Sequence, residues 1–423
     1  MQSKSGFRKE WEVPTPSDGW RAEAAARIER HRKAEFSVSL RLPGGDPWRG
    51  GRLRLCLTRH AFPFGVAVSP RWLSDGGPDG ERYRKYVLDH FSGLVASDCM
   101  KWYSVEREAG KRDWSEAETL FAFAREHDLP LRGHCLLWAR THWVQPWVRA
   151  LPTDALRRVV ESHVTEAAER GRGRVHCWDV INELLDGHFF TGRLGRDFPR
   201  WLFETVHAID PEARLFLNEY TVLEDGYRHA TYLRLIDEFR DAGLPLGGIG
   251  IQEHDAQNVL LPGDQRGRDF WKLGLDDNRL LVPGEVWQRL DAFAARGLPI
   301  HLTEVTSWSD DDERRAEALA DFYRLAFSHP AVESIHLWGF WERAHFRRRA
   351  ACLLDTDWNA LAPSKALTRL LHKEWGTDVS GEPDADGVFC FRGFPGRYRL
   401  EIGGETRVLN LCAEKPKVKV TMA

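Results

Sequence analysis

The segment Val175-His-Cys-Trp-Asp-Val-Ile-Asn-Glu183 is a short apolar run that ends in two polar residues, Asn182 and Glu183. The segment Pro299-Ile-His-Leu-Thr-Glu304 has the same form, with Glu304 directly after its apolar residues. Short apolar runs bounded by polar residues are typical of buried β-strands. We therefore expect two strands, each with a glutamate at its C-terminal end.

Similar runs recur on both sides of these two segments and alternate with longer helical patterns, which is typical of βα units. Eight strands are expected in all, at Phe62–Val68, Gly93–Ala96, Leu131–Leu137, Val175–Ile181, Arg214–Asn218, Gly248–Gln252, Pro299–Thr303 and Ser334–Trp338. The helices expected between them are Ser115–His127, Thr153–Arg170, Arg200–Ala208, Arg228–Ala242, Gly284–Arg296 and Asp312–Ser328. This order predicts an α/β protein with a (β/α)8 TIM barrel, whose site lies at the C-terminal strand ends.

The two ends of the chain have a different, alternating pattern that predicts accessory strands. After a helix from Asp18 to Arg32, Phe36–Leu42 and Arg52–Thr58 alternate on either side of a Gly- and Pro-rich turn, which predicts a hairpin. Four further strands are expected at Gly387–Gly393, Gly396–Ile402, Thr406–Cys412 and Val418–Met422. We expect the two ends to form one β-sandwich beside the barrel, with a structural role favoured over the alternative of a carbohydrate-binding module. The expected domains are 1–58, 59–375 and 376–423.

Composition excludes several classes of partner. The 423-residue chain has a formal net charge of −3, which gives no bulk attraction for nucleic acid. No apolar stretch approaches the roughly 18 residues of a membrane span. The first residues lack the apolar core of a signal peptide, so we expect a cytoplasmic protein unless a leader has been removed, and a monomer. The seven cysteines have no CxxC spacing, so they are expected to be mostly free and buried, and no metal or cofactor is expected.

The polar motifs at the expected strand ends occur in a characteristic order. They are Met100-Lys-Trp102, Arg132-Gly-His-Cys-Leu-Leu-Trp138, Trp178-Asp-Val-Ile-Asn-Glu183, Leu217-Asn-Glu-Tyr220, Gly248-Ile-Gly-Ile-Gln-Glu-His254, Leu302-Thr-Glu304 and Trp338-Gly339. In this order the set resembles glycoside hydrolase family 10, the endo-β-1,4-xylanase family, over roughly residues 62–372. The resemblance implies a retaining mechanism, with Glu183 as general acid/base and Glu304 as nucleophile. The substrate is then expected to be a polysaccharide or oligosaccharide.

Physical chemistry adds expectations for the residues around the two glutamates. An acid needs burial or a negative neighbour to keep its proton, whereas a nucleophile needs donors that keep it ionised. We expect His254 to be such a donor, and Gln252 and Asn182 to hold the substrate near the reacting carbon. By the resemblance, further residues bind sugar on the glycone side, form the floor of the cleft or support the site: Lys101, His134, Trp138, Trp338, Asn218 and Tyr220.

Several positions depart from the family pattern. Asp98 replaces a sugar-binding Asn, Arg140 lies in a rebuilt stretch after Trp138, and Thr306 replaces an Asp that helps to orient a His. We therefore expect hydrolysis of a β-linked sugar with altered subsites, with xylan as the best single substrate. Basic residues near two of the loops raise the alternative of an acidic glycan, against ordinary surface charge: Arg140, His142, Arg343 and His345.

Two other readings compete with a retaining hydrolase. One is a barrel that binds carbohydrate without cutting it, although binding alone requires neither an acid nor a nucleophile. The other is a metal-dependent hydrolase, prompted by His134, His254, His301 and His336. Metal sites need several ligands that converge on one ion, whereas His301 and His336 fall inside expected strands. The exact sugar and the choice between endo and exo action stay open.

Overall fold

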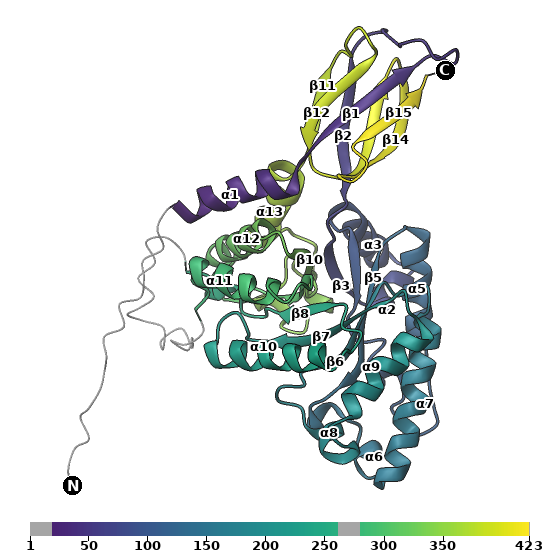
Figure 1. Ribbon diagram of the computed structural model, residues 1–423, viewed down its shortest axis with the longest axis vertical. Coiled ribbons are helices and arrows are strands. Elements are labelled where there is room, and N and C mark those ends of the chain that lie inside the picture. The colour runs from purple at the N-terminus through teal and green to yellow at the C-terminus, as the bar shows by residue number, and fades with distance from the viewer. Residues whose placement is uncertain (1–18, 261–279, 423) are drawn as a thin grey trace, which may run out of the picture.

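The computed structural model describes residues 19–260 and 280–422 and confirms the predicted barrel (Figure 1). Eight parallel strands close in the order β10-β3-β4-β5-β6-β7-β8-β9. Their bounds are β3 (Phe64–Val68), β4 (Gly93–Ala96), β5 (Leu131–Trp138), β6 (Cys177–Asn182), β7 (Arg214–Tyr220), β8 (Gly248–Gln252), β9 (Ile300–Val305) and β10 (Val332–Leu337). Each matches an expected strand to within about two residues.

Helices follow the barrel strands. The longer ones are α3 (Pro78–His90), α5 (Ser115–Glu126), α7 (Thr153–Gly171), α9 (Phe198–Ile209), α10 (Gly226–Asp241), α11 (Pro283–Ala294), α12 (Asp312–Ser328) and α13 (Ala362–Arg369). Shorter segments are α2 (Pro70–Ser74), α4 (Trp102–Val105), η1 (Thr141–Trp143), α6 (Pro146–Arg149), α8 (Phe189–Leu194), η2 (Ala256–Asn258), η5 (Glu342–Ala344), η6 (Arg348–Ala350) and η7 (Leu370–Glu374). Asp225 and Asp311 cap the N-termini of α10 and α12, since each carboxylate accepts from backbone N–H in the first turn of its helix. Within the described residues, no helix is long and apolar enough to cross a membrane.

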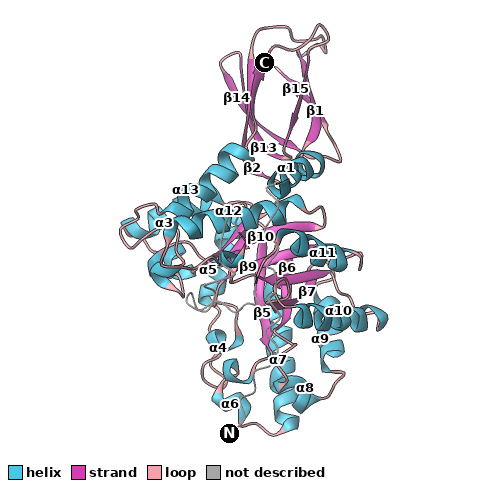
Figure 2. Cartoon of the chain, turned by 90° about the vertical axis from the view of Figure 1, so that its left-hand side faces the viewer, coloured by secondary structure: helices cyan, strands magenta, loops and turns pink. Residues whose placement is uncertain are grey.

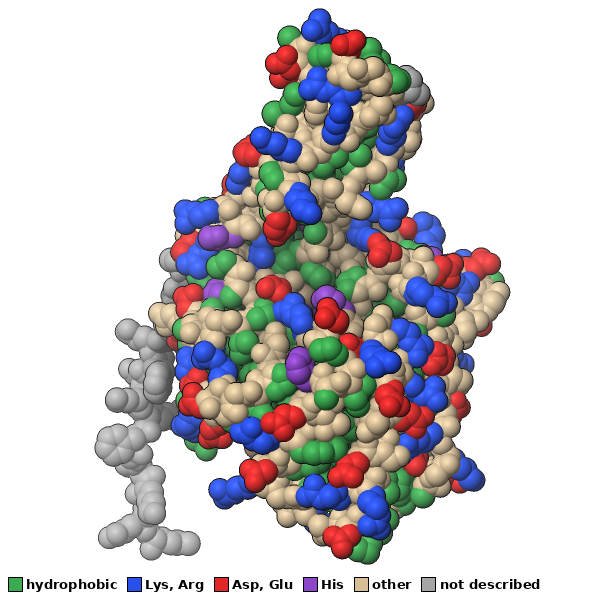
Figure 3. Space-filling view, turned by 45° about the vertical axis from the view of Figure 1, so that its right-hand side comes forward, with side chains coloured by type: hydrophobic (Ala, Val, Ile, Leu, Met, Phe, Trp, Pro, Cys, Tyr) green, Lys and Arg blue, Asp and Glu red, His purple; other side chains and the backbone are tan. Residues whose placement is uncertain are grey.

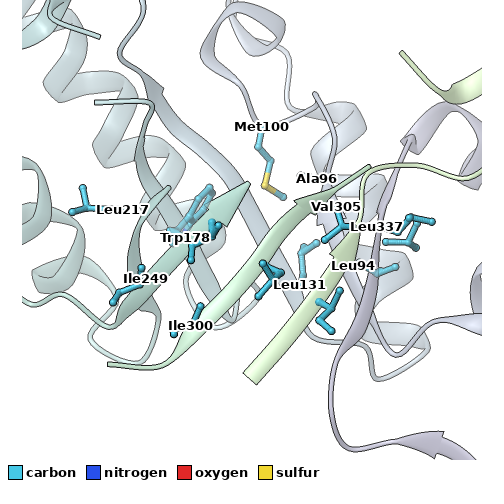
Figure 4. Packing of buried hydrophobic residues seen from close by; sticks show 14 of the residues in the cluster. Leu94, Ala96, Met100, Leu131, Trp178, Leu217, Ile249, Ile300, Val305 and Leu337 are labelled. Atoms are coloured by element: carbon cyan, nitrogen blue, oxygen red, sulfur yellow. The ribbon is translucent and has the colours of Figure 1, made fainter. Parts of the chain in front are cut away.

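The barrel strands are apolar because helices cover one face and the closed interior covers the other. Every residue of β6, β8 and β9 is buried. Figure 4 shows apolar side chains of the barrel strands packed close together, among them Leu131, Ile249 and Leu337. Polar side chains gather instead at the C-terminal strand ends, where the candidate site lies. On the face drawn in Figure 3, basic and acidic side chains are interspersed.

The two ends of the chain form the predicted β-sandwich, which lies to one side of the barrel (Figures 1 and 2). One sheet has the order β12-β1-β15 and the other β11-β2-β13-β14. Their bounds are β1 (Ala34–Arg41), β2 (Leu53–His60), β11 (Asp378–Gly381), β12 (Val388–Gly393), β13 (Gly396–Ile402), β14 (Glu405–Leu411) and β15 (Lys417–Thr421). Phe36, Leu55, Tyr398 and Leu400 are among the residues of their shared core.

The predicted hairpin of the first two strands is wrong, because β1 and β2 lie in different sheets. Both neighbours of β1 are C-terminal strands: β12 pairs with it antiparallel and β15 parallel. Likewise β2 lies between β11 and β13. The two strands face one core from opposite sides, so their alternation fits a sandwich as well as a hairpin. Strand β11 was not predicted.

Helix α1 (Gly19–Arg32) precedes the sandwich but packs on the barrel. Its Arg21 Nε donates to Asp321 Oδ1 of α12 at 3.0 Å. Its Arg32 Nε donates to the carbonyl of Phe327 at 2.7 Å, at the end of the same helix. These two arginines attach the start of the described chain to the outside of the barrel.

Candidate active site

Glu183 directly follows β6 and is buried, with 7% of its surface exposed. Its φ of 57° lies in the left-handed region, which costs a non-glycine residue energy and is common at functional sites. The backbone N–H of Glu183 donates to the carbonyl of Asn218 at 3.0 Å. This bond to β7 fixes the point from which the carboxyl leaves the strand.

Glu304 is the penultimate residue of β9 and is 4% exposed. Its two oxygens have different donors. Asn218 Nδ2 donates to Oε1 at 2.8 Å, and His254 Nε2 donates to Oε2 at 3.1 Å. A third group, His134 Nδ1, lies 3.7 Å from Oε1. Donors on both oxygens are what a permanently ionised carboxylate needs.

Asn218 connects the two glutamates. Its backbone carbonyl accepts from the backbone N–H of Glu183, and its side-chain amide donates to Glu304. Asn182 Oδ1 accepts from both Asn218 Nδ2 at 2.8 Å and Gln252 Nε2 at 3.0 Å. These bonds fix the orientation of the Asn182 amide. The sequence predicts only a supporting role for Asn218, and its bond to Glu304 was not predicted.

The surroundings drive the two carboxyl groups in opposite directions. Burial raises the pKa of Glu183, and the negative charge of Glu304 acts in the same direction, while Arg140 opposes both. Burial would also raise the pKa of Glu304, but His134, His254 and Lys101 together bring this pKa below its ordinary value. Glu183 therefore tends to hold a proton under conditions in which Glu304 is ionised.

His134 is held in place by the buried ion pair of Arg132 and Asp179. Its Nδ1 donates to Asp179 Oδ2 at 2.9 Å, and Arg132 Nε donates to the same oxygen at 3.0 Å. The second Asp179 oxygen accepts from Arg132 Nη2. All three side chains are buried in the barrel. The ion pair fixes the position of the imidazole beside Glu304.

His254 has Thr306 as its second partner. Thr306 Oγ1 lies 3.1 Å from His254 Nδ1, and the opposite ring nitrogen donates to Glu304. A neutral imidazole protonated at Nε2 satisfies both contacts when the hydroxyl donates to Nδ1. The hydroxyl thus orients the ring at the position where the sequence analysis noted the loss of an Asp.

A second group of predicted residues surrounds Lys101. Its Nζ lies 4.7 Å from the ring centre of Trp138 and 5.5 Å from that of Trp338, and it donates to Asp98 Oδ1 at 3.1 Å. The ring of Trp338 also lies 5.1 Å from that of His134. This contact joins the Lys101 group to His134, which lies beside Glu304.

Arg140 lies between Tyr220 and Glu183. Arg140 Nη1 lies 3.1 Å from the Tyr220 hydroxyl and 3.4 Å from Glu183 Oε2. Tyr220 in turn donates to Asp186, which also accepts from Arg228 Nη1 at 2.9 Å. The structure thus brings Arg140 to the acid/base candidate, a contact that spacing along the chain did not reveal.

Two aromatic side chains near the site were also not predicted. Trp143 stacks on Trp138, with ring centres 4.3 Å apart and an interplanar angle of 16°. Phe346 is 58% exposed, and its ring centre lies 5.7 Å from that of His254. Both follow predicted strand ends, so aromatic residues in strand-end loops were the available signal.

The expected basic cluster around the cleft is only partly formed. Arg343 Nη1 pairs with Asp79 Oδ2 at 2.8 Å, and His345 is buried. Arg140 lies beside Glu183, and His142 lines a surface groove together with Trp143. The basic residues that remain near the site therefore lie on the side of the loop after β5.

The histidines that prompted a metal-dependent reading have protein neighbours. His301 Nδ1 lies 3.1 Å from Arg132 Nη1, and His336 packs against the backbone of Gly65. Among residues 19–260 and 280–422, no three His, Cys, Asp or Glu side chains are grouped to hold a metal ion. The donor atoms of the site are instead arranged as hydrogen-bond partners.

Comparison with known proteins gives a consistent result. The model of glycosyl hydrolase family 10 matches residues 53–369. The anti-sigma-I factor RsgI6 of Acetivibrio thermocellus is 32% identical over 391 residues, which are 92% of this chain and 47% of that protein. Endo-1,4-beta-xylanase 2 of Arabidopsis thaliana is 32% identical over 372 residues, which are 86% of this chain and 32% of that protein. The chain therefore spans half or less of these two relatives.

The structure is also similar to that of native xylanase 10B from Thermotoga maritima. The TM-score is 0.62 and the identity 25%, over 74% of this chain and 95% of that chain. The similarity thus extends over almost the whole of that smaller protein.

Proposed function

The chain belongs to glycosyl hydrolase family 10, and from this premise we propose that it cleaves β-1,4-linked xylan-type polysaccharide or oligosaccharide with retention at the anomeric carbon. The observation that carries the proposal is that the pKa values of two carboxyl groups are shifted in opposite directions, although both residues are hydrogen-bonded to Asn218. Asn218 binds both glutamates, while the pKa of Glu183 is raised and that of Glu304 is lowered. Simple binding of sugar requires no such difference.

The proposed reaction has two steps. In the first, Glu183 gives its proton to the oxygen of the departing sugar while a Glu304 oxygen bonds to the anomeric carbon. In the second, the Glu183 carboxylate takes a proton from water, the water oxygen bonds to the same carbon, and Glu304 is released. Donors from Asn218 and His254 keep Glu304 ionised before each cycle.

Proton NMR during hydrolysis of a β-1,4-xylo-oligosaccharide tests the proposal. We expect the β-anomer of the new reducing end to appear first and the α-anomer to grow in only as mutarotation proceeds. Cello-oligosaccharides of equal length are the matched control for the sugar, and we expect slower turnover of them. Initial appearance of the α-anomer would contradict retention, and absence of turnover with both series would contradict the proposed activity.

Arg140 offers a test of how the acid is tuned. Replacing Arg140 with Ala removes a positive charge that favours ionised Glu183, so the pKa of Glu183 rises further. Since Glu183 must be protonated to act, the alkaline limb of the kcat/KM profile is expected to move upward by about half to one pH unit. Glu304 and the buried Glu219, whose pKa burial raises to about 8, are unchanged in this variant.

The matched control for this experiment is Arg140→Lys, which keeps the charge. We expect its alkaline limb to lie closer to that of the unmodified protein than the limb of Arg140→Ala does. A limb that stays in place or moves to lower pH in Arg140→Ala would show that Arg140 does not tune the acid.

A further inference from the structure

A groove of about 320 Å³ opens beside the aromatic residues that follow β5. Its lining includes the aromatic residues Tyr103 and Trp143 and the basic residues Arg107, His142 and Arg149. Trp143 is 39% exposed, although large apolar side chains are mostly buried. An exposed indole beside basic side chains is suited to a ligand that has both an apolar sugar face and negative charge.

The groove lies near the side chains that surround Glu304. Trp143 stacks on Trp138 at 4.3 Å, and the ring centre of Trp138 lies 6.4 Å from that of His134. His134 lies 3.7 Å from Glu304. Two ring contacts thus link Trp143, which lines the groove, to His134 beside Glu304.

The positive charge of the groove is not neutralised by nearby carboxylates. Within the described part of the chain, Arg107, His142 and Arg149 have no carboxylate oxygen within 4.0 Å. The neighbouring carboxylates have other partners. Glu108 pairs with Lys111 at 2.6 Å. Asp98 accepts from Lys101 and Tyr103. The groove therefore presents a net positive face to a ligand.

The backbone under the groove is held firmly. Gln145 Nε2 and Trp147 Nε1 both donate to the carbonyl of Glu106, at 3.2 and 3.3 Å. The Glu106 carboxylate accepts from Trp102 Nε1 at 3.0 Å and from Arg112 Nε at 2.8 Å. Arg107 comes directly after this anchored residue. A fixed backbone reduces the entropy lost when the ligand is bound.

We propose that this groove is a distal subsite that binds a carboxylate-bearing sugar residue of the substrate chain. The indole of Trp143 contacts the sugar ring, and Arg107 and Arg149 bind the carboxylate. The inference rests on the proposed function, because the rest of the oligosaccharide is then bound around Glu183 and Glu304. It places the recognition of acid on the outer side of Trp138, away from Arg343 and His345.

The experiment compares two xylo-oligosaccharides of equal length, one neutral and one with a single uronic acid substituent. For the unmodified protein we expect kcat/KM to be about five- to tenfold higher for the acidic one at low salt. The preference should shrink in about 0.5 M salt, because the Debye length is then only about 4 Å. In the double variant Arg107→Ala/Arg149→Ala the ratio should fall close to one. The control Arg397→Ala/Arg399→Ala removes two sandwich charges and should keep the preference.

Equal kcat/KM values for the two oligosaccharides in the unmodified protein would overturn the inference. So would a preference that survives in the double variant, because the acid would then be bound elsewhere. Absence of turnover with both would overturn the proposed function instead. In that event, calorimetric titration of Glu304→Gln protein measures binding without turnover, and adding Arg107→Ala/Arg149→Ala should weaken binding of the acidic oligosaccharide about five- to tenfold while leaving binding of the neutral one unchanged.

Discussion

Replacing Glu304 with Ala is expected to lower kcat for an aryl β-xyloside by about 10⁴-fold or more. The variant loses the only group placed to bond to the anomeric carbon in the proposed first step. It also leaves the amide of Asn218 and the imidazole of His254 without the carboxylate that accepts from them. The measurement is steady-state turnover, with circular dichroism to show that the barrel is folded.

A small anion supplies the control for this variant. Azide fits the space left by the deleted side chain and should restore turnover with formation of an α-glycosyl azide, because it attacks from the side that Glu304 occupied. The variant Glu253→Ala removes another buried glutamate from the end of β8 and should form no such product. Undiminished turnover of Glu304→Ala would exclude this residue as the nucleophile.

Replacing Glu183 with Ala is expected to have an effect that depends on the leaving group. For an unactivated xylo-oligosaccharide, whose departing oxygen needs a proton, kcat/KM should fall by about 10³-fold. For a dinitrophenyl xyloside, whose leaving group departs without a proton, kcat/KM should fall by less than about tenfold. Since water is then activated poorly, the glycosyl-enzyme should accumulate and a burst of dinitrophenol should precede slow turnover.

The burst separates the two glutamates, because Glu304→Ala cannot form the covalent intermediate. Mass spectrometry of the Glu183→Ala protein during turnover should find the added glycosyl mass. In this variant azide should give a β-glycosyl azide, the opposite anomer to that from Glu304→Ala. Equal losses for both leaving groups would contradict the assignment of Glu183 as the acid.

The barrel was predictable because each of its strands leaves a strong local signal. β6, β8 and β9 are buried on both faces, so most of their residues are apolar and polar residues mark their C-terminal ends. The sandwich strands were also visible from their alternation. Their partners were not, because alternation shows only which residues face a core. The hairpin prediction failed when β12 and β15 took both neighbouring positions of β1.

The candidate site divides in the same way. Glu183, Glu304, Asn182, Gln252 and His254 come directly at strand ends, and the structure brings them together as neighbours. Other contacts join side chains whose geometry no local pattern specifies. The approach of Arg140 to Glu183 depends on the path of the loop after β5, and the contact of Thr306 with His254 depends on the register between β8 and β9.

The sandwich has a consequence for synthesis of the protein. Ala34 pairs with Gly393, and Ser37 with Lys417, so nearly the whole barrel is made before β1 meets either neighbour. During that interval both long edges of β1 and β2 are unprotected and open to pairing with other chains. The later strands β12 and β15 thus cover the two edges of β1, and loss of the segment from β12 to β15 would harm solubility although no side chain of the candidate site lies in it.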